Sequence, residues 1–525
     1  MKEKSKRIIY NIGIFLIIAL AVAVVVIPKA IGNLDELWNF NFANNVANGL
    51  VLYRDFNMVQ TPLLPIVNAI FLTIFGNELI VMRILACLLC AGVLFTFYKI
   101  LNLLKANKGI SLFAVMALFY VLKDYFCMDY NFAVLFVTLI IIYIEIKRAL
   151  NITNWKKDLL VGVLAGMCIM LKQSTGVIVA IALLGYNIFL IRNKKEFIEY
   201  IKGTLFKILG ILIPIAIIFI YLATNGAITD FWDYCIAGIK TFTNKIPYLK
   251  LLDNEKLHIK VLCVLTPVLL AITFIYSALR ENRKLLIVSS LSIAAFSAVY
   301  PIADEVHFLI GILPSGLILF YLTDLILNKV IKRICILKSK VESQKIEKNS
   351  EDNKNENKQK ENIENTEKFI NIWLEYFLIF MVIGITAWYG YKSIPTIKEY
   401  LKNCTNDVKH FSNIVITDYT YQKIQAMDSF ITSQDKPVYI LDAEAALYQI
   451  PLDIYYKDYD MFLIGNIGSK GEEGQIEKLE KDNNKIVVIK SDGVSLNWQN
   501  PNKVRKYIKQ NMDYKYSILY FDVYE

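Results

Sequence analysis

Residues 8–27 read IIYNIGIFLIIALAVAVVVI and follow the basic residues Lys2, Lys4, Lys6 and Arg7. A helix that crosses a bilayer needs about 20 predominantly apolar residues, so this stretch predicts a transmembrane span. A cleaved signal peptide also begins with basic residues. Here, however, no small-residue cleavage site follows the apolar run, and further apolar stretches come after it. The opening stretch therefore predicts a protein held in the membrane from its first helix.

The composition of the whole chain agrees with this prediction. Of its 525 residues, 56% are hydrophobic, which gives more apolar surface than a soluble globule needs to bury. The net charge of +10 does not indicate a nucleic-acid partner, because the basic residues cluster in alternate loops. These clusters are residues 2–7, 99–108, 147–157, 192–207, 280–284 and 329–340. Since basic loops stay in the cytoplasm, the pattern places the N-terminus there.

We expect about eleven apolar segments to span the membrane. Their approximate bounds are residues 8–27, 79–99, 109–122, 131–147, 158–171, 174–191, 205–222, 259–279, 284–300, 306–327 and 369–390. An odd number of spans places the C-terminus outside the cell. Residues 62–76 are apolar too, but they are short and contain Pro62 and Pro65, which predicts a helix in the membrane interface.

Composition divides the chain into four parts. They are a transmembrane domain (1–335), a disordered charged cytoplasmic loop (336–368), a last transmembrane helix (369–390) and an extracytoplasmic α/β domain (391–525). The charged loop is rich in Lys, Glu, Asn and Gln and buries too little apolar area to offset chain entropy.

In the α/β domain, the sequence predicts strands and helices in alternation. Strands are expected at 413–417, 437–441, 461–464, 485–489 and 516–521, with helices at 472–481 and 502–511. Alternation of this kind favours a mostly parallel sheet.

Two adjacent carboxylates, Asp35 and Glu36, follow the first span. The loop that holds them, residues 33–56, reads NLDELWNFNFANNVANGLVLYRDF and leads to Pro62-Leu63. Taken alone, an acidic pair also fits the first turn of a solvated helix, because carboxylates stabilise a helix N-terminus. The longer string favours a functional loop.

This string resembles the first external loop of the GT-C membrane glycosyltransferases, in the branch of the protein O-mannosyltransferases and the bacterial aminoarabinose transferases. In that branch an Asp-Glu pair is followed by a helix, a Gly, an aromatic-rich turn and a Pro-Leu that opens an interfacial helix ending in Phe-Gly. The matching positions are Asp35-Glu36, Gly49, Tyr53, Pro62-Leu63 and Phe75-Gly76, with Arg83 early in the second span. An arginine at that position also suits snorkelling toward the interface.

Four later segments resemble further parts of the family pattern, in the expected order. They are Met128–Asn131, Gly166–Gln173, Asp230–Tyr234 and Tyr300–His307. Each alone also fits an interfacial anchor. The resemblance covers residues 1 to about 330 and does not extend to the α/β domain. Asp129 is followed by Tyr, where the better-known branches have Pro or Glu.

The resemblance implies that residues 1–335 form a catalytic domain, which transfers a sugar with inversion from a polyprenyl-phosphate-linked donor to a cell-surface acceptor. The reacting carbon then lies at the headgroup plane, so the reactive groups are expected at the outer ends of spans. Asp35 is expected to act as the base that takes the proton of the acceptor hydroxyl. Asp129 or Glu36 is expected to stabilise the developing oxocarbenium ion.

Cations are expected to bind the departing lipid phosphate. Lys172, Arg54 and His307 are the candidates for this role, and Tyr53 is expected to contact the substrate. No cofactor is certain, although paired carboxylates allow a divalent cation. The partners expected are the lipid-linked donor, a protein, lipid or glycan acceptor, and membrane lipids.

Two other functions compete with this interpretation. A transporter or flippase for a polysaccharide or lipid usually places ionisable groups near the middle of its spans, whereas here they gather at the outer side. A non-enzymatic scaffold that presents the α/β domain explains that domain but leaves the loop string without a reason.

Overall fold

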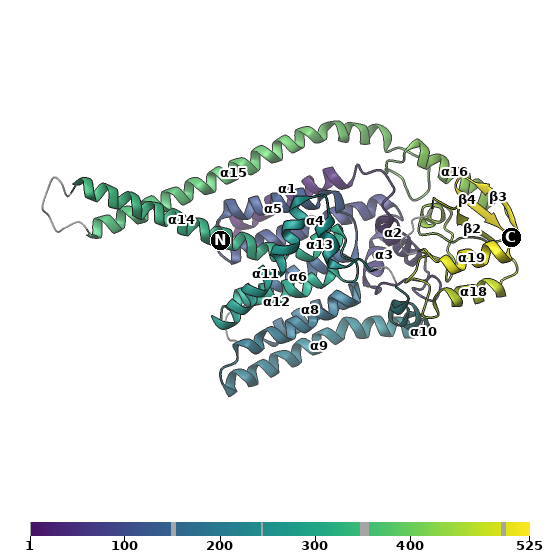
Figure 1. Ribbon diagram of the computed structural model, residues 1–525, viewed down its shortest axis with the longest axis horizontal. Helices are drawn as coiled ribbons and strands as arrows, with labels where there is room; N and C mark the ends of the chain where they lie inside the picture. The colour runs from purple at the N-terminus through teal and green to yellow at the C-terminus, as the bar shows by residue number, and fades with distance from the viewer. Residues whose placement is uncertain (1, 149–153, 243–244, 347–355, 495–499) are drawn as a thin grey trace.

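Long apolar helices run side by side through the body of the molecule (Figure 1). The computed structural model describes residues 2–148, 154–242, 245–346, 356–494 and 500–525. The long helices are α1 (Lys2–Val26), α4 (Leu79–Leu103), α5 (Lys108–Leu122), α6 (Tyr130–Lys147), α7 (Trp155–Leu171), α8 (Gln173–Gly185), α9 (Lys194–Thr224), α11 (Leu257–Leu279), α12 (Arg283–Phe296), α14 (Ser315–Ile346) and α15 (Glu356–Asn403), with the short α13 (Glu305–Ile312) before α14.

Every predicted span contains a helix, and the predicted multi-pass membrane protein is confirmed. Among the described residues, seven helices are long and apolar enough to cross a membrane. The number is eight if α13 and α14, which meet at an angle of 54°, form one bent span. The remaining predicted spans correspond to α5, α7 and α12, which have only 15, 17 and 14 residues. The number of eleven spans therefore stays a prediction.

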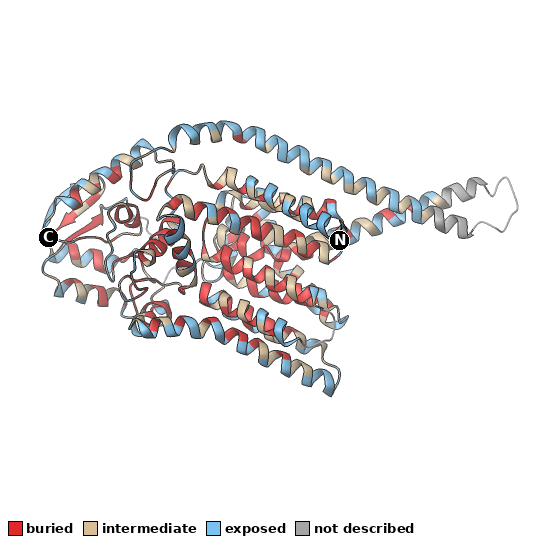
Figure 2. Cartoon of the chain, turned by 180° about the vertical axis from the view of Figure 1, so that it is seen from behind, coloured by how far each residue is buried: buried red, intermediate tan, exposed pale blue. Residues whose placement is uncertain are grey.

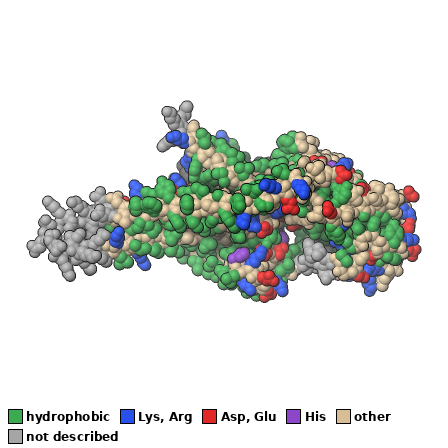
Figure 3. Space-filling view, turned by 90° about the horizontal axis from the view of Figure 1, so that it is seen from above, with side chains coloured by type: hydrophobic (Ala, Val, Ile, Leu, Met, Phe, Trp, Pro, Cys, Tyr) green, Lys and Arg blue, Asp and Glu red, His purple; other side chains and the backbone are tan. Residues whose placement is uncertain are grey.

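The outer surface of the bundle is apolar. Large side chains such as Leu20, Ile70 and Ile217 are more than half exposed. Over residues 363–403, helix α15 is exposed or half-buried except at Ser393, and Figure 2 shows it apart from the buried centre of the bundle. Figure 3 shows apolar side chains across the middle of the molecule and acidic ones gathered toward the C-terminal domain. A surface of this kind suits contact with lipid chains.

Small residues let α7 and α9 pack with their backbones close together. A Cβ atom added to Gly162 of α7 would lie 2.2 Å from the carbonyl oxygen of Lys207, and one added to Gly210 of α9 would lie 2.3 Å from that of Leu159. Glycines at such crossings are typical of helix pairs in membranes, where close van der Waals packing drives association.

Two shorter helices, α2 (Leu34–Ala47) and α3 (Leu63–Phe75), lie with the C-terminal domain at one end of the bundle (Figure 1). The side chain of Asn33 caps α2 by accepting a hydrogen bond from the backbone N–H of Glu36 at 3.2 Å. Helix α2 is buried on nearly every side. Helix α3 coincides with the predicted interfacial segment 62–76.

The C-terminal domain is built on a four-stranded sheet. Its strands are β1 (Val438–Ile440), β2 (Ile486–Lys490), β3 (Tyr514–Ile518) and β4 (Phe521–Tyr524), in the order β1-β2-β4-β3. Its helices are α16 (Asp418–Thr432), α17 (Ala446–Gln449), α18 (Gly471–Lys481) and α19 (Asn502–Asn511).

Four predictions for this sheet are wrong. Only β1 and β2 pair in parallel, whereas β4 runs antiparallel to both β2 and β3. The expected single strand at 516–521 is part of a hairpin, because the chain reverses at Leu519, which has a φ of 56°. Residues 461–464 form turns, and in 413–417 Val415 makes only an isolated bridge with Ala30.

The predicted disordered loop at 336–368 is also largely helical. Helix α14 continues to Ile346 and α15 begins at Glu356, while residues 347–355 lie outside the described residues. Lys, Glu and Gln have high helix propensity, so the composition that prevents a packed core still permits helices here.

Helix α2 is bound to the C-terminal domain by polar contacts. Asn41 and Asn45 donate hydrogen bonds to the two carboxylate oxygens of Asp460, at 3.0 and 3.2 Å. Asp460 is fully buried, and its backbone N–H donates to Asn57 at 2.8 Å. The indole N–H of Trp38 donates to the carbonyl oxygen of Ala443 at 2.7 Å. The asparagine-rich sequence of α2 thus satisfies a buried carboxylate of the other domain.

Candidate active site

A buried ion pair fixes the start of α2. Arg83 of α4 is only 1% exposed, and its Nε and Nη2 atoms each donate to one carboxylate oxygen of Glu36 at 2.9 Å. The Nη1 atom of Arg83 donates to the carbonyl oxygens of Ile27 and Lys29, at 3.1 and 2.5 Å. Both oxygens of Glu36 are therefore occupied, and the ion pair joins the start of α2 to α4. The expected chemical role of Glu36 stays a prediction.

Asp35, one residue earlier, is free of this pair. A water-sized molecule reaches its side chain, although protein surrounds it on most sides. This partial removal from water, together with the charge of Asp129, raises the pKa of Asp35 to about 7. A carboxyl group with a pKa near neutrality is matched to proton transfer at physiological pH.

Asp129 caps α6, and its hydrogen-bond partner Asn131 links it to Lys172. Its carboxylate accepts hydrogen bonds from the backbone N–H of Asn131 at 2.5 Å and from the side-chain amide of Asn131 at 3.1 Å. The Nζ atom of Lys172, at the junction of α7 and α8, donates to the Oδ1 atom of Asn131 at 2.6 Å. It also lies 5.4 Å from the ring centroid of Tyr130.

Burial opposes the charge of both ionisable groups in this chain of contacts. It raises the pKa of Asp129, although the hydrogen bonds from Asn131 and the charge of Lys172 act in the opposite direction. It lowers the pKa of Lys172 to about 8, although Asp129 and Asp304 favour the charged amine.

Asp304 and His307 at the start of α13 form the last part of the cluster. The Oδ1 atom of Asp304 accepts from the backbone N–H of His307 and lies 2.8 Å from the Nδ1 atom of its ring. Burial alone would raise the pKa of Asp304, but the contacts with His307 bring it below its usual value. The side chain of His307 stays 21% exposed.

The ionisable side chains of this region interact electrostatically with one another. The pKa of Asp35 responds to Asp129, His307 and Asp304, and that of Lys172 responds to Asp129 and Asp304. Four segments that are far apart in the sequence therefore bring three carboxyl groups, one amine and one imidazole to one place. We call these five residues, Asp35, Asp129, Lys172, Asp304 and His307, the acidic cluster.

Two predicted binding residues lie outside the acidic cluster. Tyr53 has a φ of 68° and is fully buried, and its hydroxyl donates to the carbonyl oxygen of Gln60 at 2.6 Å. Arg54 forms a two-bond pair with Asp55, at 2.8 Å for each bond. The Nη1 atom of Arg54 also donates to the carbonyl oxygen of Asn225 at 3.2 Å. The predicted roles of Tyr53 and Arg54 in binding the donor stay predictions.

Asp304 and Asn131 belong to the site but were not predicted as site residues. Both lie inside segments that carried the family resemblance, Met128–Asn131 and Tyr300–His307. In the sequence, Asn131 and Asp304 are polar residues close to Asp129 and His307, which were the predicted site residues. Among the described residues, no three His, Cys, Asp or Glu side chains are placed to hold one metal ion together. The divalent cation stays a prediction.

No protein-family model matches the chain, and no curated protein matches it in sequence. Solved structures do match. ArnT from Cupriavidus metallidurans bound to undecaprenyl phosphate has a TM-score of 0.56 at 11% sequence identity, over 99% of this chain and 98% of that chain. The apo state of the same protein gives 0.53 at 12% identity over the same shares. AglB from Archaeoglobus fulgidus, in complex with an inhibitory peptide and a dolichol-phosphate, gives 0.47 at 11% identity, over 98% and 74%.

ArnT is an aminoarabinose transferase with the GT-C fold. The similarity to ArnT includes the C-terminal domain, to which the sequence resemblance did not extend. Agreement over nearly the full length of both chains confirms the resemblance at the level of architecture. This chain is a polytopic membrane protein with the GT-C fold.

Proposed function

We propose that this protein is a membrane glycosyltransferase that moves a sugar from a polyprenyl-phosphate donor to a hydroxyl group of a cell-surface acceptor. The observation that carries the proposal is the acidic cluster, in which a carboxyl group with a pKa of about 7 lies among two further carboxyl groups, an amine and an imidazole. Transfer of a sugar to a hydroxyl group requires a base for the proton of that hydroxyl and donors that stabilise the anionic leaving group. The cluster contains groups of both kinds.

The fold supports the class of donor. ArnT, which shares this fold, has been solved with undecaprenyl phosphate bound, and this lipid is a polyprenyl phosphate. Helix α3 and helix α2, which carries Asp35, lie at the end of the bundle that carries the C-terminal domain (Figure 1). With the N-terminus in the cytoplasm, this arrangement fits a reaction at the outer headgroup plane.

The proposed reaction is a single displacement with inversion. Asp35 takes the proton of the acceptor hydroxyl while the oxygen attacks the anomeric carbon. The bond between that carbon and the phosphate oxygen breaks, and the lipid phosphate leaves as an anion. Asp129 stabilises positive charge on the sugar ring, while Lys172 and His307 donate hydrogen bonds to the departing phosphate.

The direct test uses the purified protein in lipid nanodiscs. A set of undecaprenyl-phosphate sugars, each with a radiolabelled sugar, is supplied with delipidated cell-envelope material as acceptor. We expect the label to move from the lipid to the acceptor and free undecaprenyl phosphate to appear. A transporter would carry the donor across a vesicle membrane without breaking the sugar-phosphate bond, and this result would reject the proposal. Chelation of divalent cations in the same assay tests the metal requirement.

The proposal predicts a bell-shaped dependence of kcat/KM on pH. Asp35 must be deprotonated to act as a base, so activity is lost as pH falls through about 7. Lys172 must be protonated to assist the phosphate, so activity is lost as pH rises through about 8. Initial rates of undecaprenyl phosphate release across the neutral pH range measure both limbs. An acidic limb near the ordinary carboxyl pKa would contradict the role of Asp35.

Replacing Lys172 with Gln should lower kcat/KM by about 10- to 100-fold, because a hydrogen bond to a charged group is lost. Gln keeps a donor for Asn131 but removes the charge. The alkaline limb of the pH profile should disappear as well. Lys123→Gln is the matched control, since this outer lysine pairs with the exposed Asp124. Equal losses in the two variants would argue against a specific role for Lys172.

A further inference from the structure

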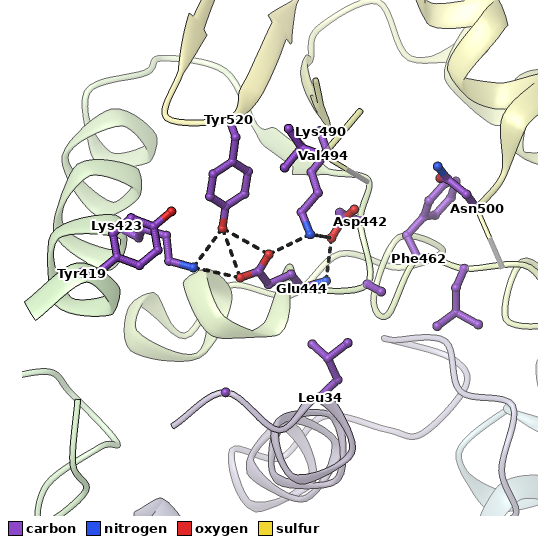
Figure 4. A pocket seen from close by; sticks show the side chains of 13 residues that line it. Leu34, Tyr419, Lys423, Asp442, Glu444, Phe462, Lys490, Val494, Asn500 and Tyr520 are labelled. Atoms are coloured by element: carbon purple, nitrogen blue, oxygen red, sulfur yellow. Dashed lines mark hydrogen bonds and ion pairs between the residues drawn. The ribbon is translucent and has the colours of Figure 1, made fainter. Parts of the chain in front are cut away.

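A cleft of about 420 Å³ lies between the C-terminal domain and the start of α2 (Figure 4). Its volume falls in the range of about 300–1,000 Å³ that is typical of small-molecule sites. The side chains that carry the argument are Asp442 and Glu444 after β1, Lys490 at the end of β2, Tyr520 between β3 and β4, and Tyr419 and Lys423 of α16. The cleft thus lies beyond the carboxyl ends of the parallel strands, where open α/β sheets bind ligands.

A closed network of hydrogen bonds and ion pairs fixes the polar wall. Glu444 accepts from the Nζ atom of Lys423 at 3.2 Å and from the hydroxyl of Tyr520 at 3.1 Å, and its other oxygen lies 2.8 Å from the Nζ atom of Lys490. Lys490 also pairs with Asp442 at 3.1 Å. The hydroxyl of Tyr520 receives a further hydrogen bond from Lys423 at 3.0 Å. These contacts hold the side chains in place before any ligand binds.

The network is neutral and still offers both donors and acceptors. Its two amines and two carboxylates balance in charge. An amine has three donors, and Lys423 and Lys490 each use two of them within the network. Within the described residues, the Oδ2 atom of Asp442 accepts no hydrogen bond. A strongly charged ligand would meet a like charge here, whereas a hydroxyl group both donates and accepts.

An aromatic side chain adds an apolar face. Tyr419 is 63% exposed, and its ring lies 5.1 Å from the Nζ atom of Lys423. An aromatic ring beside paired polar groups suits a ligand with an apolar face and a polar rim. A sugar ring has this combination, because its C–H bonds form one face and its hydroxyl groups surround it.

The cleft is joined to the acidic cluster by the chain itself. Gly32 and Leu34 line the wall opposite the sheet, and Leu34 immediately precedes Asp35. Consecutive Cα atoms are about 3.8 Å apart, so the cleft ends at the residue next to the proposed base. The bond from Trp38 to Ala443 fixes the two walls relative to each other.

We propose that this cleft binds a neutral, hydroxyl-rich glycan, which is the acceptor of the transferred sugar. The acceptor role rests on the proposed function, whereas binding of the glycan is independent of it.

The test uses the full-length protein in nanodiscs without donor. Fluorescently tagged oligosaccharides, released from the cell envelope of the source organism by mild acid, are separated by anion exchange into a neutral and an anionic fraction. Equilibrium dialysis then measures the binding of each fraction. We expect the neutral fraction to bind, and Tyr419→Ala and Asp442→Asn each to weaken its Kd by about tenfold. Tyr455→Ala, an exposed tyrosine of the same domain outside the cleft, is the matched control.

Each outcome decides a specific point. No binding of the neutral fraction, preference for the anionic fraction, or equal binding by the cleft variants would overturn the proposal. Asp35→Asn should bind the glycan normally. Glycan binding without any donor turnover would reject the proposed function alone. Donor turnover with glycan binding unchanged in both cleft variants would reject only the proposal that the cleft is the glycan-binding site.

Discussion

Replacing Asp35 with Asn is expected to lower sugar transfer by about 10²–10⁴-fold, the usual contribution of a general base. Asn has nearly the same shape but cannot take a proton. The neighbouring Glu36 is held by Arg83 through both oxygens and cannot replace it. Expression and membrane insertion should not change, because the side chain of Asp35 supports neither the helix cap nor the buried ion pair. Release of undecaprenyl phosphate from labelled donor measures the loss.

Asp124→Asn is the control for this experiment. Asp124 is an exposed carboxylate before α6, with 72% of its side chain accessible, and its partner Lys123 is also at the surface. We expect full activity for this variant. If Asp35→Asn retained transfer at the wild-type rate, Asp35 would not be the base and the role would pass to Asp129 or Asp304.

Replacing Arg83 with Leu should destabilise the protein by about 3–5 kcal/mol, because it leaves the buried Glu36 charge without a partner. The carbonyl oxygens of Ile27 and Lys29 also lose their donor. Since the ion pair holds the start of α2, transfer activity should fall together with stability. Denaturant unfolding of the purified protein in detergent, with wild type in parallel, measures the change in free energy.

A second variant distinguishes two effects of Arg83→Leu: the loss of the ion pair and the burial of an unpaired Glu36 charge. Glu36→Leu together with Arg83→Leu removes both charges, and we expect it to be more stable than Arg83→Leu alone. Its activity should stay low, since the ion pair then no longer orients the start of the loop that carries Asp35. A double variant as active as wild type would show that the ion pair has no positioning role.

The spans were predictable because a long apolar segment has few alternatives to a membrane helix. The sheet was less predictable. The turn at Leu519 and the antiparallel pairing of β4 depend on tertiary contacts that a short apolar run does not encode. Lys-, Glu- and Gln-rich composition similarly indicated disorder at 336–368, where the high helix propensity of these residues extends α14 and α15.

The site was predicted in part for a related reason. The motif around Asp35-Glu36 indicated two carboxylates but not which of them faces the reaction. That choice depends on Arg83, a residue of α4 placed there by packing. Tyr53 and Arg54 lie outside the acidic cluster, where their side chains bond to Gln60 and Asp55, and a string of residue types does not encode these contacts. Asn131 links Asp129 to Lys172, and this link depends on the approach of Lys172 in the folded chain.

The asparagines of α2 have a consequence for how this protein can be modified by recombination. A change of composition separates residues 391–525 from the rest, yet Asp460 of that part depends on Asn41 and Asn45 for its hydrogen bonds. The buried carboxylate of one part is therefore matched to the asparagines of the other. A chimaera that takes the C-terminal domain of another protein must also take the α2 of that protein. The two segments form one structural unit, although they lie far apart in the sequence.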